Sequence, residues 1–425
     1  MRISSALYFQ TGLNSINKQQ SKLMHVYQQL GSGNRMLTPA DDPLAAAQTL
    51  TLGQSQSMNA RFAENRHVAL RNLGEEENVL MSMIPQVSGA KTRLVEAANG
   101  TLSDADRFIL AEVFDEMRNS IANLANAKDA NGQYIFSGSK GNVAPFQKNE
   151  LTDRYEYKGD QTERLVQADQ TRQIPSANHG VDLLLRPTPG SALFLTSGDA
   201  ANTGTGVVGG VTITDPSQAT QIASYEINYT EDASTPPNGQ LEITTTNLDG
   251  TTATTTVPYA PAEKGGATTV DLGNGVSLQF SGKPQVGDSF SLENAQSKTG
   301  DDELNVLNTL ADVVAALKTP VEGDPAAKAS MQNVINGAMQ RLDMSYENIL
   351  TVRASVGARM NEIDAIESSG KLQGLHLATE ISRLEDLDYY SASTQLELRT
   401  SALEAAALAF KKIQSTNLFA INARG

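Results

Sequence analysis

The segment ALYFQTGLNSINKQQSKLMHVYQQL, residues 6–30, decides the fold of this chain. Its apolar or bulky side chains recur in alternating steps of three and four residues, a heptad pattern that predicts one stripe along a long helix. The stripe is weak, because Ala6 is small and Gln20 is polar. A long helix with so narrow a stripe needs a packing partner. The stripe consists of Ala6, Phe9, Leu13, Ile16, Gln20, Leu23, Tyr27 and Leu30.

The other end of the chain carries matching stripes. From Met331 to Val356, residues of types that are usually buried recur again in alternating steps of four and three. A further stripe follows Leu396, Leu403 and Phe410, with Ala392, Ala406 and Ile413 at the alternating positions. Both ends are therefore predicted to form long amphipathic helices that can lie side by side.

The terminal stripes can pack in two ways, either between subunits or within a private two-helix coil. Packing between subunits is the favoured interpretation, because these helices stand at the chain ends and have only each other as local partners. The predicted assembly interface comprises Phe9, Leu13, Ile16, Leu23, Leu30, Leu396, Leu403, Phe410 and Ile413.

A turn is predicted between the first two helices. Gly31–Gly33 interrupts the first heptad pattern, and residues 38–43 read TPADDP. Asp42 suits a helix N-cap and Pro43 the first helical position. Two adjacent carboxylates could also serve acid–base chemistry, but capping explains them better. We therefore assign a structural role to Pro39, Asp41, Asp42 and Pro43.

The middle of the chain changes character and predicts β structure. From about residue 131 to 294 it is rich in Thr, Gly and Pro, with alternating apolar residues. One hairpin is predicted around Pro236–Gly239, and another around Gly273–Gly275. The fold class is therefore α+β, a long antiparallel helical rod and coiled coil built from both termini, with an inserted, mainly β domain. The predicted divisions are 1–40 with 385–425 (terminal helices), 41–133 with 298–384 (rod), and 134–297 (β domain, in one or two parts).

Composition excludes several classes of function. The 48 acidic and 33 basic side chains give a formal charge of -15, which opposes a nucleic-acid partner because phosphate backbones require cationic surface. The absence of cysteine excludes disulfides and thiolate chemistry. No run approaches the roughly 18 apolar residues of a membrane span, and the N-terminus does not resemble a signal peptide. We expect no nucleic-acid partner, no membrane insertion and no cofactor.

Two short motifs that suggest ligand chemistry have simpler interpretations. The pattern Gly204-x-Gly206-x-x-Gly209 leads into a strand pattern, whereas a dinucleotide loop must open a helix. Glu64 and His67 have the spacing of metal ligands but no second pair to complete a site. Because the other histidines, His25, His179 and His376, are isolated, no catalytic site and no enzyme are predicted.

Several longer motifs together resemble one family, the bacterial flagellin-like axial proteins. The resemblance covers about residues 1–147 and 300–425, and its forms TPADDP and NGQYIFSG are similar to those of hook–filament junction subunits rather than filament flagellins. The motifs are LGSGNRMLTPADDP (30–43), AAAQ (45–48), NGTLSD (99–104), NGQYIFSG (131–138), ISRLEDLD (381–388) and LAFKKIQ (408–414).

The resemblance implies an extracellular structural subunit of the flagellum that is exported by the flagellar type III apparatus without a cleaved signal peptide. It implies a homo-oligomeric ring between hook-associated protein 1 and flagellin, with a dedicated export chaperone for the C-terminal helix. Filament flagellin is the first alternative function. A secreted adhesin or effector that acts through its β domain is the second.

Overall fold

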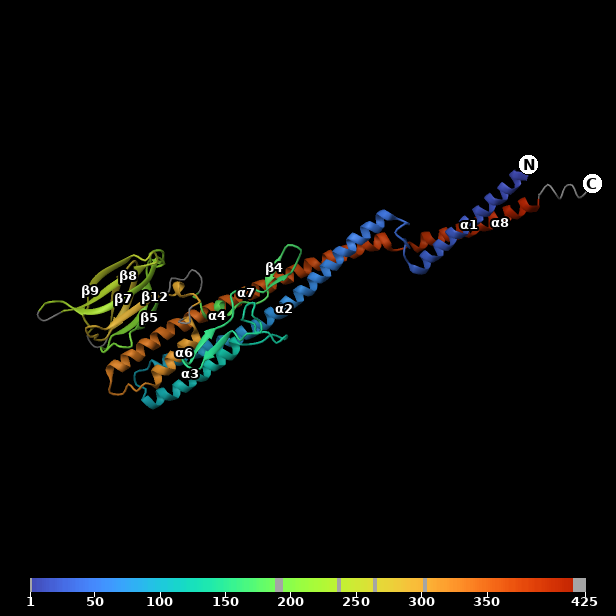
Figure 1. Cartoon of the computed structure of the whole chain (residues 1–425). Coiled ribbons are helices and arrows are strands. Elements are labelled where there is room, and N and C mark those ends of the chain that lie inside the picture. The colour runs from blue at the N-terminus through green and yellow to red at the C-terminus, as the bar shows by residue number, and fades with distance from the viewer. Residues whose placement is uncertain (1, 188–193, 235–237, 263–265, 301–303, 416–425) are drawn as a thin grey trace, which may run out of the picture. The chain divides into compact units, whose positions relative to one another are not determined.

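The computed structural model describes the chain apart from residues 1, 188–193, 235–237, 263–265, 301–303 and 416–425. The order of elements is helical, then β, then helical again, which confirms the predicted fold class (Figure 1). The chain divides into two compact units. The first unit contains residues 1–64 and 365–425, and the second contains residues 65–364.

The first unit is built from helices only. Helix α1 (Arg2–Ser32) lies beside α8 (Tyr389–Ser415). The beginning of α2 (Pro43–Ala97) lies beside the end of α7 (Pro325–Glu385), where the Asn59 amide donates to the Gly370 carbonyl over 2.8 Å. The unit therefore pairs the two ends of the chain, as the sequence predicts.

The second unit has a helical part with a continuous apolar core. It contains the rest of α2 and α7 together with α3 (Asp104–Ala125) and α6 (Val306–Lys318). Ser103 and Asp106 form a capping box at the start of α3. The stripe predicted on α7 is buried throughout, and its members are Met331, Ile335, Ala338, Leu342, Ser345, Ile349, Val352 and Val356.

The β segment predicted over 134–297 has two parts of different character. Its first part lies against the helices, since the Tyr155 amide donates to Asn308 of α6 over 2.7 Å and the Asn178 amide approaches the Glu76 carboxylate of α2. This part contains two short hairpins and one helical turn: β1 (Phe146–Asn149), β2 (Arg154–Tyr157), β3 (Leu165–Gln167), β4 (Gln173–Pro175) and α4 (Gly180–Leu184).

The second part is a domain of two antiparallel sheets around one apolar core. One sheet has the order β5-β12-β7-β8-β9 and the other β10-β11-β6. Both predicted hairpins are confirmed, as β7 pairs with β8 and β10 with β11. The elements are β5 (Phe194–Gly198), β6 (Val207–Ile213), α5 (Pro216–Ala219), β7 (Ile222–Glu231), β8 (Gly239–Asn247), β9 (Thr252–Pro258), β10 (Ala267–Gly273), β11 (Val276–Ser281), β12 (Ser289–Asn294) and the 3-10 turn Ala295–Lys298.

The glycine-rich stretch before β6 is a loop of this domain. The buried Asp288 carboxylate accepts the backbone N–H groups of Thr203 and Gly204, at 2.8 and 3.0 Å. Gly206 then leads directly into β6, a strand. The amides that would have to face a phosphate are thus already bonded within the chain.

Helix α7 attaches to the β domain through a row of amide side chains. Asn333 accepts the Val208 N–H over 2.8 Å and donates to the Gly206 carbonyl over 3.0 Å. Gln340 accepts the Thr196 N–H over 2.9 Å. The amides therefore occupy hydrogen-bonding positions on the outer sides of β5 and β6, where a further strand would otherwise pair.

The β domain is expected to be dispensable for the folding of the helices. Phe194 and Asn294 are paired residues on adjacent strands, so a short Gly-Ser linker from Ser191 to Ser297 can replace the domain. The shortened chain should keep its helical circular dichroism and lose about 1–3 kcal/mol of stability, because Leu304 and Met344 lose apolar neighbours. A shortened chain that loses its helical circular dichroism would contradict this division of roles.

Candidate assembly surface of the terminal helices

The predicted stripe on α1 separates into a face toward α8 and an exposed face. Ile16, Leu23 and Leu30 are partly buried, and Val26, which the sequence prediction omitted, is 4% exposed. By contrast, Leu13 is 39% and Tyr27 is 52% exposed. Both the buried and the exposed residues are separated from Ile16 by heptad steps of three and four. The periodicity of the sequence alone therefore cannot predict which of them face α8. The exposed set is free to contact another molecule.

An aromatic pair joins the two terminal helices. The rings of Phe9 and Phe410 have centroids 5.0 Å apart, a favourable distance for tilted aromatic packing. A Cβ at Gly12 would lie 2.8 Å from a ring carbon of Phe410, so the glycine gives the ring room to approach α1. The structure thus brings two of the predicted interface residues together within one chain.

The remaining predicted interface residues lie along the same helix pair. Leu396 and Leu403 are partly buried, Phe9 is 45% exposed, and Ala392 at an alternating position is buried. The side chains of Ala6 and Ile413 lie outside the described part of the chain. The pair is therefore only partly covered by its own residues, and its outer surfaces keep exposed apolar groups.

The first unit has very little core of its own. Among its described residues, the only buried hydrophobic side chains are Val26, Ala45, Leu377 and Ala392. Its exposed large apolar side chains are far more numerous, and patches of this kind mark interaction surfaces. They are Leu7, Phe9, Leu13, Met24, Tyr27, Leu44, Leu50, Met58, Leu372, Leu375, Tyr389, Tyr390, Leu398 and Leu408.

The TPADDP turn has its own network of hydrogen bonds. The Asp41 carboxylate accepts the backbone N–H groups of Leu37 and Thr38, at 2.9 and 2.8 Å. The bond from Thr38, followed by the contact with His25 at 3.1 Å, lowers the pKa of Asp41 to about 2. Because the pKa of Asp41 is lower in the folded chain, its carboxylate contributes to the stability of the turn at neutral pH. This contribution is lost only as the pH falls from about 4 toward 2.

Two further residues of the motif begin α2. The Asp42 carboxylate accepts the Ala45 N–H over 3.1 Å, as an N-cap does, and Pro43 is the first residue of the helix. This confirms the capping geometry predicted from the sequence. Pro39 is exposed and lines a groove described below.

Arg35 joins this turn to the end of α7. Its backbone N–H donates to the Glu385 carbonyl over 2.7 Å, and its guanidinium donates to the Leu384 carbonyl over 3.0 and 3.1 Å. Helix carbonyls at a C-terminus lack partners within the helix, and a cation is favourable there. The Leu387 N–H also donates to the carbonyl of Gly33, whose φ of 75° suits glycine.

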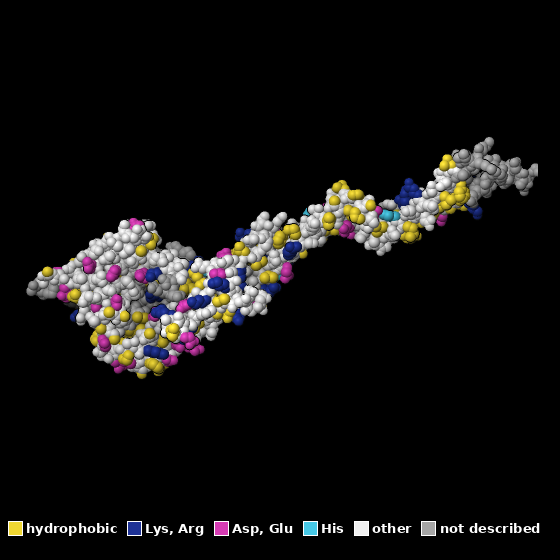
Figure 2. Space-filling view, in the orientation of Figure 1, with side chains coloured by type: hydrophobic (Ala, Val, Ile, Leu, Met, Phe, Trp, Pro, Cys, Tyr) yellow, Lys and Arg dark blue, Asp and Glu magenta, His cyan; other side chains and the backbone are white. Residues whose placement is uncertain are grey.

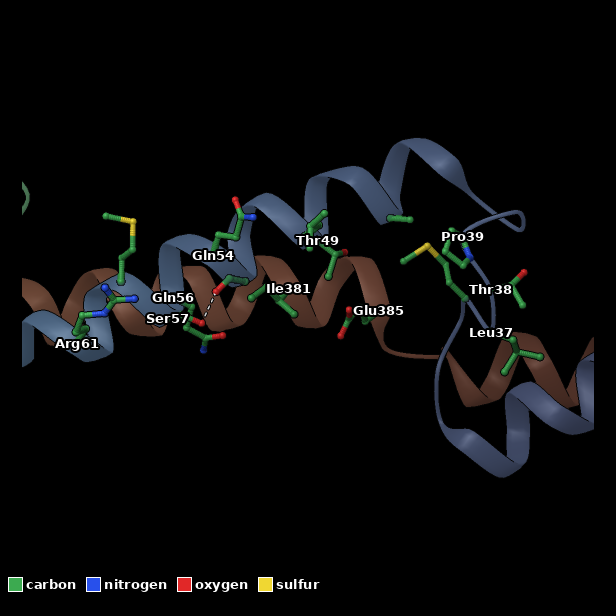
Figure 3. Close-up of a pocket in the computed structure, with 15 residues that line it drawn as sticks. Leu37, Thr38, Pro39, Thr49, Gln54, Gln56, Ser57, Arg61, Ile381 and Glu385 are labelled. Carbon is green, nitrogen blue, oxygen red and sulfur yellow. Dashed lines mark hydrogen bonds between the residues drawn. The ribbon is translucent and has the colours of Figure 1, made fainter.

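A shallow groove of about 920 Å³ lies beside this junction (Figure 3). Residues of the turn and of α2 form most of its lining, and Ile381 and Glu385 contribute from α7. Its apolar lining includes Met36, Leu37, Pro39, Leu50 and Met58, with Arg61 at its α2 side. The groove lies within the first unit and adds to its uncovered apolar surface.

The described residues contain no group of three or more His, Asp or Glu side chains placed to hold a metal ion. Among them, no helix is both long and apolar enough to cross a membrane.

Comparisons with known proteins agree with this description. Residues 3–141 match the family model for the bacterial flagellin N-terminal helical region. The chain is 26% identical to flagellar hook-associated protein 3 of Salmonella typhimurium and 25% identical to that of Escherichia coli, over 99% of this chain and 100% of each relative.

Solved structures give the same result. The crystal structure of FlgL from Xanthomonas campestris matches with a TM-score of 0.64 and 27% identity, covering 78% of this chain and 99% of that one. Flagellar hook-associated protein 3 from Legionella pneumophila matches with a TM-score of 0.66 and 26% identity, covering 79% and 98%.

In the helical pairing of both termini and in these matches, the chain is similar to one class of protein, the flagellin-like proteins of the bacterial flagellum. Within that class, the chain resembles flagellar hook-associated protein 3 over essentially its full length. The relatives are structural proteins, which favours a structural role here over catalysis.

Proposed function

We propose that this chain is a structural subunit of the bacterial flagellum that forms the junction between hook and filament. The chain assembles with further copies of itself through its terminal helices, and the copies close into a ring. The full-length resemblance to hook-associated protein 3 favours this function over filament flagellin. An adhesin acting through the β domain has no support from these relatives.

One observation carries the assembly part of the proposal. The first unit buries few hydrophobic side chains among its described residues, yet it exposes more large apolar side chains than the second unit, which is more than twice as long. Such a unit gains its burial from neighbouring molecules. The exposed face of α1 and the groove beside the turn are the surfaces available for them.

The partners follow from the resemblance. We propose that hook-associated protein 1 lies on the hook side of the ring and flagellin on the filament side, and that a dedicated export chaperone binds the C-terminal helix before assembly. Export proceeds through the flagellar type III apparatus without a cleaved signal peptide. A chain without disulfides and with a weakly packed first unit suits transport in an unfolded state.

Deletion of the gene tests the proposed function. A deletion strain should make hooks that carry no filament and should release flagellin into the medium. Supplying the chain from a plasmid should restore attached filaments and swimming. Filaments of normal length that stay attached in the deletion strain would contradict a junction role.

A further inference from the structure

The beginning of α2 presents different residues on the two flanks of its contact with α7. Ala45 is buried, and Asn59 bonds to the Gly370 carbonyl of α7, which places the contact along these positions. Successive residues of a helix turn by about 100°, so their spacing assigns the other residues to one flank or the other. The groove side contains Ala46, Leu50, Gly53 and Ser57. The Leu44 side contains Leu44, Ala47, Gln48 and Thr51.

The groove side is apolar and carries one carboxylate near the turn. Leu37 and Leu50 line the groove, and Ile381 lines it from α7 (Figure 3). Figure 2 shows hydrophobic side chains gathered where α2 begins. Glu385 of α7 lines the end of the groove beside the turn, and no ion pair for its carboxylate is found in the described part of the chain. The groove therefore offers apolar surface with an acceptor for a cation at one end.

The Leu44 side carries the complementary groups. Leu44 itself is 71% exposed. Glu380 and Arg383 of α7 belong to this side, because they line a hollow of about 470 Å³ together with Thr51 and its neighbours on α2. Arg383 pairs with Glu380 over 2.8 Å, yet its side chain is 73% exposed. A guanidinium has several N–H donors, so Arg383 can bind a second carboxylate while it keeps the first.

The two sides lie at the same height along the helix pair. Leu44 and Ala46 are two residues apart on α2, and Arg383 and Glu385 are two residues apart on α7. Two residues of a helix correspond to a rise of about 3 Å and a rotation of about 200°. Each of these pairs therefore combines one residue of each side at nearly the same level.

This arrangement suits a second copy of the chain that points in the same direction. Neighbours in a ring contact each other through two different surfaces, so one side of each copy meets the opposite side of the next. Because the two sides share one height, the neighbour's Arg383 arrives beside Glu385 and its Leu44 arrives beside the groove. No charged residue occurs between Pro43 and Ala60, so the only charges brought together here are of opposite sign.

We propose that the groove side of each copy receives the Leu44 side of the next copy, with Leu44 packed in the groove and Arg383 paired with Glu385. The proposal rests on the ring of the proposed function, since only copies that point the same way bring these opposite sides together. The contact covers apolar surface that the first unit cannot bury by itself.

A double-cysteine variant tests which sides meet, because the natural chain contains no cysteine. Thr51→Cys places a thiol on the Leu44 side, and Gly53→Cys places one on the groove side, where a Cβ meets no atom within 4 Å. The two thiols point away from each other within one helix, so a disulfide has to join two copies. Mild oxidation of hook–filament complexes from a deletion strain carrying the double variant should give dimers, trimers and longer series. Each single variant should stay monomeric.

A matched control removes one of the two sides. Thr379 stands two residues before Ile381 on α7, but its exposed side chain lies on the flank away from α2. Thr51→Cys combined with Thr379→Cys should cross-link roughly tenfold less than Thr51→Cys combined with Gly53→Cys. Equal cross-linking of the two combinations would overturn the proposal. Dimers from either Thr51→Cys or Gly53→Cys alone would also overturn it, because they require like sides to meet.

A charge exchange tests the same contact without cysteine. Glu385→Arg places two cations together between copies and should reduce the number of attached filaments roughly tenfold. Adding Arg383→Glu to the same chain should restore them, although the two residues lie on opposite sides of α7. No restoration would overturn the pairing. These outcomes concern the contact alone, whereas filaments that stay attached in the strain without the gene would refute the junction function itself.

Discussion

Replacing Phe410 with Asp should abolish the attachment of filaments while the second unit stays folded. Phe410 packs against Phe9 and over Gly12, where a carboxylate finds no cationic partner among the described contacts. A charge placed in an apolar helix seam costs on the order of several kcal/mol per subunit. Because the same cost recurs in every subunit of an assembly, we expect complete loss of swimming rather than a partial defect.

The second unit serves as the internal control for this variant. Its unfolding free energy should change by less than about 0.5 kcal/mol, because the substitution lies in the other unit. Phe410→Leu keeps an apolar side chain and should retain attached filaments. Normal filaments with Phe410→Asp would contradict the assignment of this seam. Unfolding of the second unit would also contradict it, because the variant would then damage the fold of the subunit rather than its assembly.

Replacing Glu76 with Gln should raise stability at alkaline pH by about 3 kcal/mol. Glu76 is fully buried on α2, and burial raises its pKa to about 7 despite the Asn178 N–H and the nearby Arg359 and Arg164. The neutral acid is therefore favoured in the folded state. The stability that the neutral Glu76 side chain contributes to the folded state is fully present below about pH 4.5, the pKa expected for this group in the unfolded chain. It is lost as the pH rises through 7.

Urea unfolding at several pH values between about 4.5 and 8 measures this effect. The difference between Glu76→Gln and the natural chain should grow with pH across that window. Glu116→Gln makes the same chemical change at an exposed position of α3 and should show no such growth. A constant difference between Glu76→Gln and the natural chain at every pH would show that Glu76 does not titrate in this range.

The sequence predicts best where periodicity and burial coincide. The stripe on α7 is buried at every predicted position, because its partners along the second unit cover one continuous helix face. The capping box at Ser103 and both hairpins depend on neighbouring residues, so local rules suffice for them. The fold class and the pairing of the chain ends follow from these elements together.

What the sequence did not predict depends on residues distant along the chain. Nothing near Glu76 indicates burial, since it is covered by the segment around Asn178. Asn333 and Gln340 read as ordinary polar helix residues until they meet β6 and β5. On α1, Val26 and Tyr27 fit the heptad pattern about equally well, and only the position of α8 decides which is buried.

The position of this protein along an isolated flagellum tests the central claim most directly. An antibody or a small tag on the exposed β domain can be located by electron microscopy on flagella detached with their hooks. A junction subunit should give a single band where the hook ends and the filament begins. Label along the whole filament would contradict the account and identify the chain as a filament flagellin.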